Sequence, residues 1–273
     1  MRFIGKGIIV TGSNSGIGKA TALLFAKEGA NVLIHGRDLN SLEQTLEECK
    51  AVGLGTAKFA VVQGSFDNKD LIKKIHDTAV SEFGRIDVLV NNAGQAEIGS
   101  SLTTTEDSFD RQMHLLLKVP IFLSQMCFSH LKKSKGNIVN ISSIAGIRAS
   151  SRDSFSYAIA KAALNQFTQC AGIEYGAEGV RVNAVCPGYI RTNMGLKSES
   201  SVNNLAEANA RYDEIAKAVP TKKVGTAEEA AKLIVFLASE DASMMNGACV
   251  VQDGGHSLMG LDNQTIENAA KCN

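Results

Sequence analysis

The sequence of 273 residues contains no tryptophan and only three prolines, and its acidic and basic residues balance at 28 each. Because no charge of one sign dominates, nothing in the composition favours binding to nucleic acid or to an anionic membrane. No apolar run approaches the roughly 20 residues that a bilayer-spanning helix needs, so no membrane partner is expected. The opening MRFIGKGIIVTG enters a strand-like run at once, which leaves no room for a signal peptide. We therefore expect a soluble, cytoplasmic protein.

The cysteines form no metal-binding pattern. No C-x-x-C pair and no histidine-flanked ligand spacing is present, so we expect no metal site, and the thiols are expected to be reduced. The cysteines are Cys49, Cys127, Cys170, Cys186, Cys249 and Cys272.

Short apolar runs rich in β-branched residues alternate with longer helical patterns, which predicts a doubly wound α/β fold with a parallel sheet covered on both faces. The expected strands are 7–10, 31–34, 58–62, 86–90, 137–141, 180–185 and 248–251. The expected helices are 19–29, 39–53, 69–84, 106–117, 157–176 and 227–239. We expect a single domain over 1–256, a substrate lid over about 189–218 and a C-terminal tail over 257–273.

The first strand runs into TGSNSGIGKA, residues 11–20, and opens the first helix. Glycines here would allow a tight turn and a close approach of backbone N–H groups to a phosphate at a helix N-terminus. The spacing G-x-x-x-G-x-G differs from the usual G-x-G-x-x-G dinucleotide pattern, and a simple glycine-rich connector is the alternative. Its place between a strand and a helix favours a nucleotide site.

The end of the second strand bears on the choice of nucleotide. An NAD site usually has an acidic residue there, which accepts a hydrogen bond from the ribose 2′-hydroxyl. Here the strand ends in His35-Gly36-Arg37, so a guanidinium stands where a 2′-phosphate could be paired and Gly36 leaves room for it. We predict NADP(H), with NAD(H) less favoured. In the alternative, Arg37 is a solvated loop residue and Asp38 caps the next helix.

Six motifs occur in a fixed order along nearly the whole chain. They are TGSNSGIG (11–18), NNAG (91–94), ISSIAG (141–146), YAIAK (157–161), VRVNAVCPGYIRT (180–192) and VVQDGG (250–255). One Y-x-x-x-K is almost worthless as a signal, whereas the ordered set is specific. The chain resembles the short-chain dehydrogenase/reductase family in its shorter, single-domain form.

The resemblance implies a Rossmann-type, mostly parallel sheet of seven strands that binds a nicotinamide dinucleotide, usually in a homotetramer and otherwise in a dimer. Members interconvert carbonyls and alcohols by hydride transfer, so the partner is a small-molecule substrate. Carried over, Tyr157 is the general acid/base and Lys161 holds the nicotinamide ribose and lowers the pKa of the tyrosine. Ser143 hydrogen-bonds the substrate oxygen.

The resemblance also implies a set of cofactor-binding residues. Asn91 with the backbone of Ala93 and Gly94 would line the adenosine side, and Pro187 to Thr192 would hold the nicotinamide carboxamide. The full set is Gly12, Asn14, Ser15, Gly16, Ile17, Gly18, Arg37, Ser65, Phe66, Asn91, Ala93, Gly94, Tyr157, Lys161, Pro187, Gly188, Ile190 and Thr192.

The catalytic roles agree with elementary electrostatics. Residues at i and i+4 are neighbours on a helix, so Lys161 can bring its charge beside the Tyr157 phenol. A cation about 4 Å away, at an effective dielectric constant near 20, is worth roughly 4 kcal/mol. That energy could lower a tyrosine pKa from about 10 by two to three units, toward the range useful for proton exchange.

The chain departs from the family pattern at the helix before the fifth strand, where relatives carry an asparagine that steadies a water of the proton relay. Leu116 takes that position here. His114 points about 200° around the helix and is a poor substitute. Gln112 lies one turn away on the same face and could compensate in part through water.

Further departures leave the function with two interpretations. Ser65 stands near the adenine where relatives have an aspartate, and Ser143 and Tyr157 lie one residue further apart than is common. Arg148 and Arg152 could attract an anionic substrate or simply be solvated. We predict an NADP(H)-dependent oxidoreductase acting on carbonyl and alcohol groups. The alternative is a nucleotide-binding family member with reduced or lost turnover that acts as a sensor or scaffold.

Overall fold

The structure is a computed structural model that describes residues 1–149, 154–192 and 205–259. Seven strands form one sheet in the order β3-β2-β1-β4-β5-β6-β9, and every neighbouring pair is parallel. Its strands are β1 (Gly7–Val10), β2 (Asn31–Gly36), β3 (Phe59–Gln63), β4 (Val88–Asn91), β5 (Asn137–Ile141), β6 (Arg181–Pro187) and β9 (Cys249–Gln252). A separate two-stranded ladder pairs β7 (Ile190–Arg191) with β8 (Gly225–Thr226). The predicted fold class is confirmed, and each of the seven apolar runs forms a strand.

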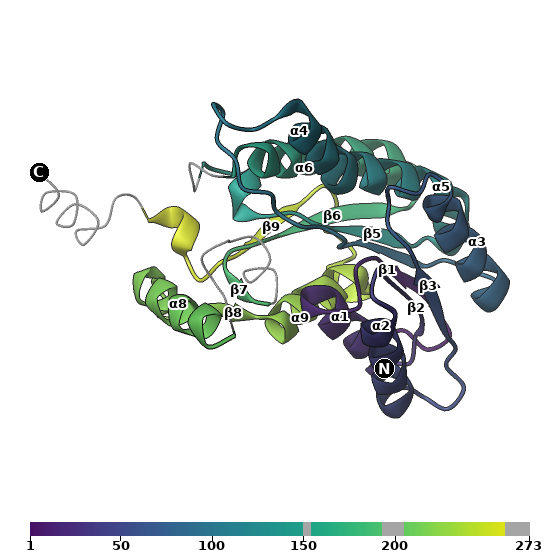
Figure 1. Cartoon of the computed structure of the whole chain (residues 1–273). Coiled ribbons are helices and arrows are strands. Elements are labelled where there is room, and N and C mark those ends of the chain that lie inside the picture. Colours follow the sequence, from purple (N-terminus) through teal and green to yellow (C-terminus); the bar gives the residue numbers. More distant parts are fainter. Residues whose placement is uncertain (150–153, 193–204, 260–273) are drawn as a thin grey trace, which may run out of the picture.

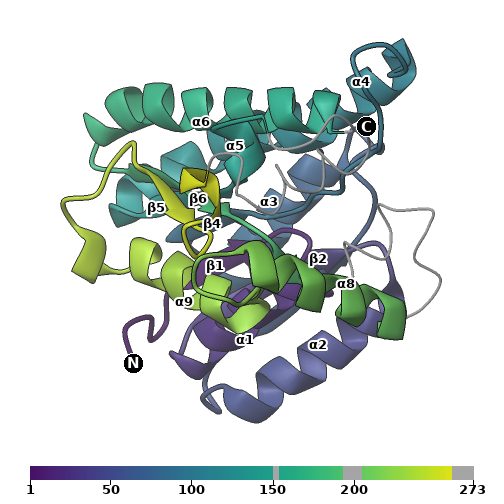
Figure 2. The ribbon, with the colours of Figure 1, turned by 90° about the vertical axis from the view of Figure 1, so that its left-hand side faces the viewer.

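Helices cover both faces of the sheet, as Figures 1 and 2 show. One layer contains α1 (Gly16–Lys27), α2 (Leu39–Val52) and α9 (Ala227–Ala238). The opposite layer contains α3 (Leu71–Phe83), α4 (Glu106–Met113), α5 (Val119–Ser134) and α6 (Phe155–Gly176). Helix α8 (Leu205–Ala218) lies at the side of the first layer, beyond α9.

The strands are apolar on both faces because each face meets a helical layer. Along β1, Ile8 and Val10 pack into the core that includes Phe25 of α1. Ile9 points to the other face and packs into the core that includes Leu123 of α5. Burying one such side chain stabilises the fold by about 1.5–3 kcal/mol, so a nearly continuous apolar strand is what this layering requires.

Helix α5 was not among the helices expected from the sequence. It begins with Val119 and Pro120 directly after the π-helical turn His114–Lys118, and the Val119 N–H donates to the His114 carbonyl. Leu123, Cys127 and Leu131 recur every four residues and are fully buried. The apolar stripe is therefore present, but the β-branched and aromatic start of the segment hides its helical period.

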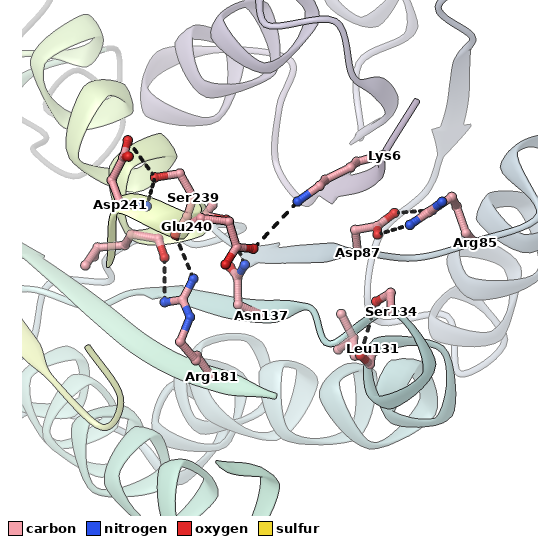
Figure 3. A network of polar contacts seen from close by, with 12 residues as sticks. Lys6, Arg85, Asp87, Leu131, Ser134, Asn137, Arg181, Ser239, Glu240 and Asp241 are labelled. Atoms are coloured by element: carbon pink, nitrogen blue, oxygen red, sulfur yellow. Dashed lines mark hydrogen bonds and ion pairs between the residues drawn. The ribbon is translucent and has the colours of Figure 1, made fainter. Parts of the chain in front are cut away.

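The amino-terminal edge of the sheet is held by a polar network (Figure 3). Both carboxylate oxygens of Asp87 accept from the Arg85 guanidinium at 2.6 and 2.7 Å, and one also accepts from the backbone N–H of Gly7 at 2.8 Å. Arg181 at the start of β6 donates to backbone carbonyls at and just after the end of α9, and Asn137 at the start of β5 donates to the Ala238 carbonyl at 2.8 Å. These contacts join the starts of β1, β4, β5 and β6 to the elements around them.

Among the described residues, no helix is long and apolar enough to span a membrane. The same residues contain no cluster of three or more histidine, cysteine or acidic side chains placed to hold a metal ion. Of the expected lid over 189–218, residues 193–204 lie outside the described part, as do residues 260–273 of the expected tail.

Candidate active site

The predicted site residues gather at the carboxyl edge of the sheet. They follow β1, β2, β3, β4, β5 and β6 directly, and because these strands are parallel their ends meet on one side of the molecule. The catalytic candidates come from the segment after β5 and from the first two turns of α6, which packs against both β6 and that segment.

Ser143 and Tyr157 are joined by a hydrogen bond between their hydroxyl groups. Ser143 also accepts from the backbone N–H of Ala145 at 3.1 Å, which caps a short 3₁₀ turn over Ile144–Gly146. Ser143 therefore caps the turn and interacts with Tyr157 at the same time.

The Lys161 ammonium is buried, with only 5% of the residue exposed. It lies 5.6 Å from the centroid of the Tyr157 ring and donates to the Ile141 carbonyl at 2.6 Å. Burial disfavours the charged form and lowers the pKa of Lys161 to about 8. The lysine and the tyrosine are brought together as expected, but the nearest anchor of the ammonium is the end of β5.

The expected effect of Lys161 on the tyrosine differs in this structure. Burial is the largest influence on Tyr157 and raises its pKa, while the hydrogen bond from Ser143 acts in the opposite direction. The ammonium lies 5.6 Å from the ring centroid and donates to the Ile141 carbonyl, and it does not reverse this shift. The described protein thus holds Tyr157 as a neutral phenol.

The glycine-rich loop after β1 has the shape expected for a phosphate site. Gly12 and Gly16 have φ of 64° and 54°, and a Cβ on Gly12 would stand only 2.8 Å from Cα of Ala93. Ser15 precedes α1 without a side-chain cap of the helix, so the first N–H groups of α1 have no partner from that residue. A backbone cradle at an uncapped helix N-terminus suits an anionic phosphate.

The two asparagines of NNAG have different places. Asn91 is 4% exposed and donates to Asn140 at 2.8 Å, so its side chain lies within the sheet layer and can serve a cofactor only through its backbone. Asn92 instead donates to the carbonyls of Thr11 and Gly12 at 2.8 and 3.0 Å. Sequence reasoning missed Asn92 as the residue that fixes the glycine loop, although it stands in the same motif.

At the end of β2 the Arg37 side chain is exposed, while Asp38 caps α2 by accepting from the backbone N–H of Ser41 at 2.8 Å. The neighbouring carboxylate is therefore occupied as a helix cap. Besides leaving room for a phosphate, glycine at position 36 avoids a steric clash, because a Cβ there would lie 2.7 Å from the Asn14 side chain. Asn14 thus lies against Gly36, the residue next to Arg37.

The segment after β3 carries a carboxylate that sequence reasoning overlooked. Ser65 donates to Asp67 at 2.7 Å, so an acidic group is present two residues beyond the position where relatives have theirs. Phe66 is buried and its ring packs against His35, with 4.7 Å between the ring centroids. Ser65 therefore orients Asp67 at the same edge where it was expected to accept a hydrogen bond itself.

The segment after β6 approaches the glycine loop. A Cβ on Gly188 would clash with Asp253 at 2.7 Å, and a Cβ on Gly16 would stand 3.2 Å from Cγ2 of Thr192. Ile190 is buried and begins the short strand β7. The expected phosphate and nicotinamide ends of the site are thus adjacent in space.

Leu116 lies in a π-helical turn, His114–Lys118, between α4 and α5. The sequence predicted continuous helix through 117, and it carries no signal for the extra residue that a π turn inserts. Leu116 is 1% exposed, and its Cδ2 would stand 3.0 Å from a Cβ placed on Gly94. An isobutyl group therefore fills the space that faces NNAG.

The two polar neighbours of Leu116 are engaged differently. His114 lies 2.9 Å from the Phe66 carbonyl through Nε2, on the side away from the catalytic residues. Gln112 is 1% exposed and donates to the Gln95 carbonyl at 3.2 Å, while its Oε1 is buried without a hydrogen-bond partner. The glutamine thus retains one free acceptor beside the relay position.

Arg148 has a structural role near the mouth of the site. Its guanidinium donates to the carbonyls of Ser257 and Met259 at 2.8 and 2.6 Å. The arginine therefore fastens the first residues of the expected tail to the segment after β5, and is not a solvated loop residue. Arg152 lies outside the described residues.

The family model and the sequence relative that match this chain are described as a reductase and an oxidoreductase. A family model described as enoyl-(acyl carrier protein) reductase matches residues 11–257. An uncharacterized oxidoreductase of Thermotoga maritima is 37% identical over 264 residues, which are 95% of this chain and 100% of the relative.

Solved structures agree with the sequence relatives. A short-chain dehydrogenase/reductase of unknown function from Caenorhabditis elegans, crystallised with cofactor, is 36% identical with a TM-score of 0.87, over 95% of this chain and 98% of that one. L-sorbose reductase from Gluconobacter frateurii, complexed with NADPH and L-sorbose, is 27% identical with a TM-score of 0.87, over 95% and 99% of the two chains.

Proposed function

The chain belongs to the short-chain dehydrogenase/reductase family, and from that premise we propose that it is an NADP(H)-dependent oxidoreductase interconverting a carbonyl and a secondary alcohol. The observation that carries the proposal is the convergence of Ser143, Tyr157 and Lys161 at the carboxyl edge of the sheet. The glycine cradle before α1 fits the phosphates of a dinucleotide.

In the reducing direction Tyr157 donates the proton and Ser143 orients the substrate. The pKa of Tyr157 is raised by burial, so the phenol is protonated before the reaction and can deliver its proton to the carbonyl oxygen. Ser143 already bonds the phenol, and its hydroxyl can donate to the same substrate oxygen. When bound, a reduced nicotinamide supplies the hydride that the carbonyl carbon receives.

Lys161 stabilises the phenolate that remains after proton transfer. Its pKa of about 8 leaves it charged at neutral pH, and the cation stands over the tyrosine ring at 5.6 Å. A charge held in a buried site is screened less than one in water, so a phenolate forming beside it is favoured. The bond to Ile141 keeps the ammonium at the end of β5 during this step.

The preference for NADP(H) rests on Arg37. Its guanidinium is exposed at the end of β2, and the carboxylate next to it is occupied in capping α2. We expect Arg37→Met to raise the KM for NADPH about tenfold or more, because a charge-assisted contact to phosphate is lost, and to leave the KM for NADH nearly unchanged. Equal effects on the two cofactors contradict the preference.

The decisive experiment is a panel of ketones, aldehydes and alcohols, assayed separately with NADPH and with NADH. Loss of NADPH absorbance with at least one carbonyl, and its abolition by Tyr157→Phe, is the expected result. Turnover that survives in Tyr157→Phe overturns the assignment of the acid/base. Failure of NADPH to outperform NADH overturns the cofactor preference alone.

Leu116 favours one second candidate, a nucleotide-binding protein with reduced turnover that acts as a sensor or scaffold. An apolar side chain packs against Gly94 at the relay position and cannot steady a water. Tight NADPH binding without turnover across the whole carbonyl panel is the outcome that would select this function.

We further propose a cytoplasmic homo-oligomer, a tetramer or a dimer. Apolar side chains on the outer faces of α5 and α6 support an interface between copies: Phe122 and Ile173 are 46% and 81% exposed. The free thiols of the described cysteines support a reducing compartment. Light scattering during size exclusion measures the assembly, and a monomer at micromolar concentration contradicts it.

A further inference from the structure

We infer that His35 is a positioning residue of the cofactor site, which fixes the glycine loop by accepting a hydrogen bond from the backbone N–H of Gly12. The importance of this contact for binding rests on the proposed function, because it presumes that the loop holds a dinucleotide. The contact itself is a property of the free protein. His35 is the second-last residue of β2 and is 3% exposed.

The ring belongs to a three-point attachment between the loop after β1 and the end of β2. Gly12 N lies 3.2 Å from Nδ1 of His35. The backbone of His35 meets Ser13 in both directions, because its carbonyl accepts from Ser13 N at 2.8 Å and its N–H donates to Ser13 Oγ at 3.0 Å. The backbone contacts would survive most substitutions of His35, whereas the contact to Gly12 needs an acceptor on the side chain.

The other side of the ring meets the segment after β3. The Phe66 ring packs on it at 4.7 Å, and the Phe66 backbone is itself held by His114. The second ring nitrogen, Nε2, is buried, makes no hydrogen bond of normal length and interacts with the backbone of Gly64. His35 therefore connects two segments that the sequence assigned to the cofactor, the glycine loop and Ser65–Phe66.

The histidine must be neutral to act in this way. Burial, aided by the positive charge of Arg37, lowers the pKa of His35 to about 4, so the imidazole carries one proton at physiological pH. Because Nδ1 accepts from Gly12, that proton is on Nε2, facing Gly64. A protonated ring would place one donor against another at Gly12.

The geometry of Gly12 makes its N–H a sensitive point. Gly12 has φ of 64°, and its Cα position is confined by Ala93 and by the carbonyl contacts from Asn92. A buried N–H without an acceptor destabilises the protein. In a variant without the ring nitrogen we therefore expect the loop to change conformation so that the Gly12 N–H meets another acceptor. That change would move the N–H groups at the start of α1, which are the ones placed to meet a phosphate.

Two variants separate positioning from simple packing. His35→Asn keeps an acceptor, Oδ1, at nearly the position of Nδ1, whereas His35→Leu keeps an apolar side chain of similar branching and loses the acceptor. Hydrogen exchange at the Gly12 amide, measured without cofactor, reports the contact directly. NADPH affinity, measured by fluorescence titration, reports its consequence.

We expect His35→Leu to speed exchange at Gly12 and to raise the Kd for NADPH about tenfold, the fold-change expected from one lost net hydrogen bond. His35→Asn should recover at least two-thirds of the loss on a logarithmic scale. In both variants kcat at saturating NADPH should change less than the Kd does. A merely structural role would instead lower thermal stability without separating the Asn variant from the Leu variant.

Equal exchange rates at Gly12 in the wild type and in His35→Leu overturn the inference, as does an equal loss of affinity in the two variants. Failure of the proposed function looks different. If neither NADPH nor NADH binds to the wild type while the Gly12 amide still responds to His35→Leu and not to His35→Asn, the dinucleotide assignment is wrong and the contact stands.

Discussion

Polar side chains are paired differently at the two edges of the central sheet. At the amino edge, Asp87 is neutralised by Nε and Nη2 of Arg85, and Arg181 donates to carbonyls at and just after the end of α9 (Figure 3). At the carboxyl edge, Lys161 is buried and Tyr157 is partly buried, and in the described part of the chain neither is paired with a charge of opposite sign.

We therefore expect the amino edge to contribute mainly to stability and the carboxyl edge to the proposed reaction. A charge with its hydrogen bonds satisfied holds strands together but has little freedom to gain or lose a proton. The groups at the carboxyl edge have pKa values moved by burial, downward for Lys161 and upward for Tyr157, which costs stability and, under the proposed function, prepares proton transfer. Changes at the amino edge should therefore alter unfolding, and changes at the carboxyl edge should alter turnover.

The largest expected effect is that of Tyr157→Phe on activity. The ring and its packing remain while the proton donor is lost, so kcat/KM should fall by roughly 10²–10⁴, the usual contribution of a general acid. Steady-state kinetics with the best carbonyl of the panel measures the loss. The midpoint of thermal unfolding should stay within about 3 °C of the wild type, because about 1 kcal/mol or less of folding energy is removed.

Arg181→Met should produce the reverse pattern. The carbonyls of Leu237, Ser239 and Met245 lose their donor, so we expect the free energy of unfolding to fall by about 3 kcal/mol, with kcat unchanged well below the unfolding temperature. Urea titration measures the fall. As a matched control, Lys132→Met breaks an exposed ion pair with Glu178 and should lower the free energy of unfolding far less. Similar losses in the two variants would remove the distinction between the amino edge and an ordinary surface.

Lys161→Met should stabilise the fold while it abolishes turnover. The pKa of Lys161 is about 8 in the folded protein, against an ordinary lysine value of 10.5, so below pH 8 the folded protein carries the full cost of a buried charge. After the lost bond to Ile141 is subtracted, we expect the variant to gain about 2 kcal/mol at pH 7.

The pH dependence gives this prediction its sign. Between pH 8 and 10.5 the unfolded wild type binds more protons at Lys161 than the folded protein does, so wild-type stability should rise with pH through this window. Lys161→Met should lack that increment, and the difference between the two proteins should shrink as pH rises. Urea titrations of both proteins at several pH values measure it, and a difference that is constant with pH would contradict a lowered pKa.

The fold was predictable because its signals are local. Each apolar run is flanked by turn residues, and β1 and β5 have the bounds that the sequence predicts. Helix α5 was missed because its beginning mixes proline with β-branched and aromatic residues, which are typical of strands and turns. The π turn has no sequence signature, since its extra residue follows from how α4 and α5 pack.

The gathering of the candidate site residues at one edge of the sheet was predictable, and their pKa values were less so. The motifs named Ser143, Tyr157 and Lys161, and spacing placed the last two on neighbouring turns. The pKa of Tyr157 is shifted the other way because burial disfavours the phenolate, while the Lys161 ammonium bonds to the Ile141 carbonyl, an acceptor supplied by a strand. Helical spacing cannot show such an acceptor, which is also why the role of Asn92 was missed.

The smallest expected effect concerns Leu116, where the carboxyl edge carries an apolar side chain in place of the relay. Leu116→Asn places a polar group four residues after Gln112, whose buried Oε1 has no hydrogen-bond partner, and we expect turnover to rise about two- to tenfold or its pH profile to shift, because an amide can hold a water that the isobutyl group cannot. Leu116→Ala opens the same space without a polar group and is the matched control. Identical pH–rate profiles in the Asn and Ala variants would mean that space, and not a relay, limits proton exchange at this edge.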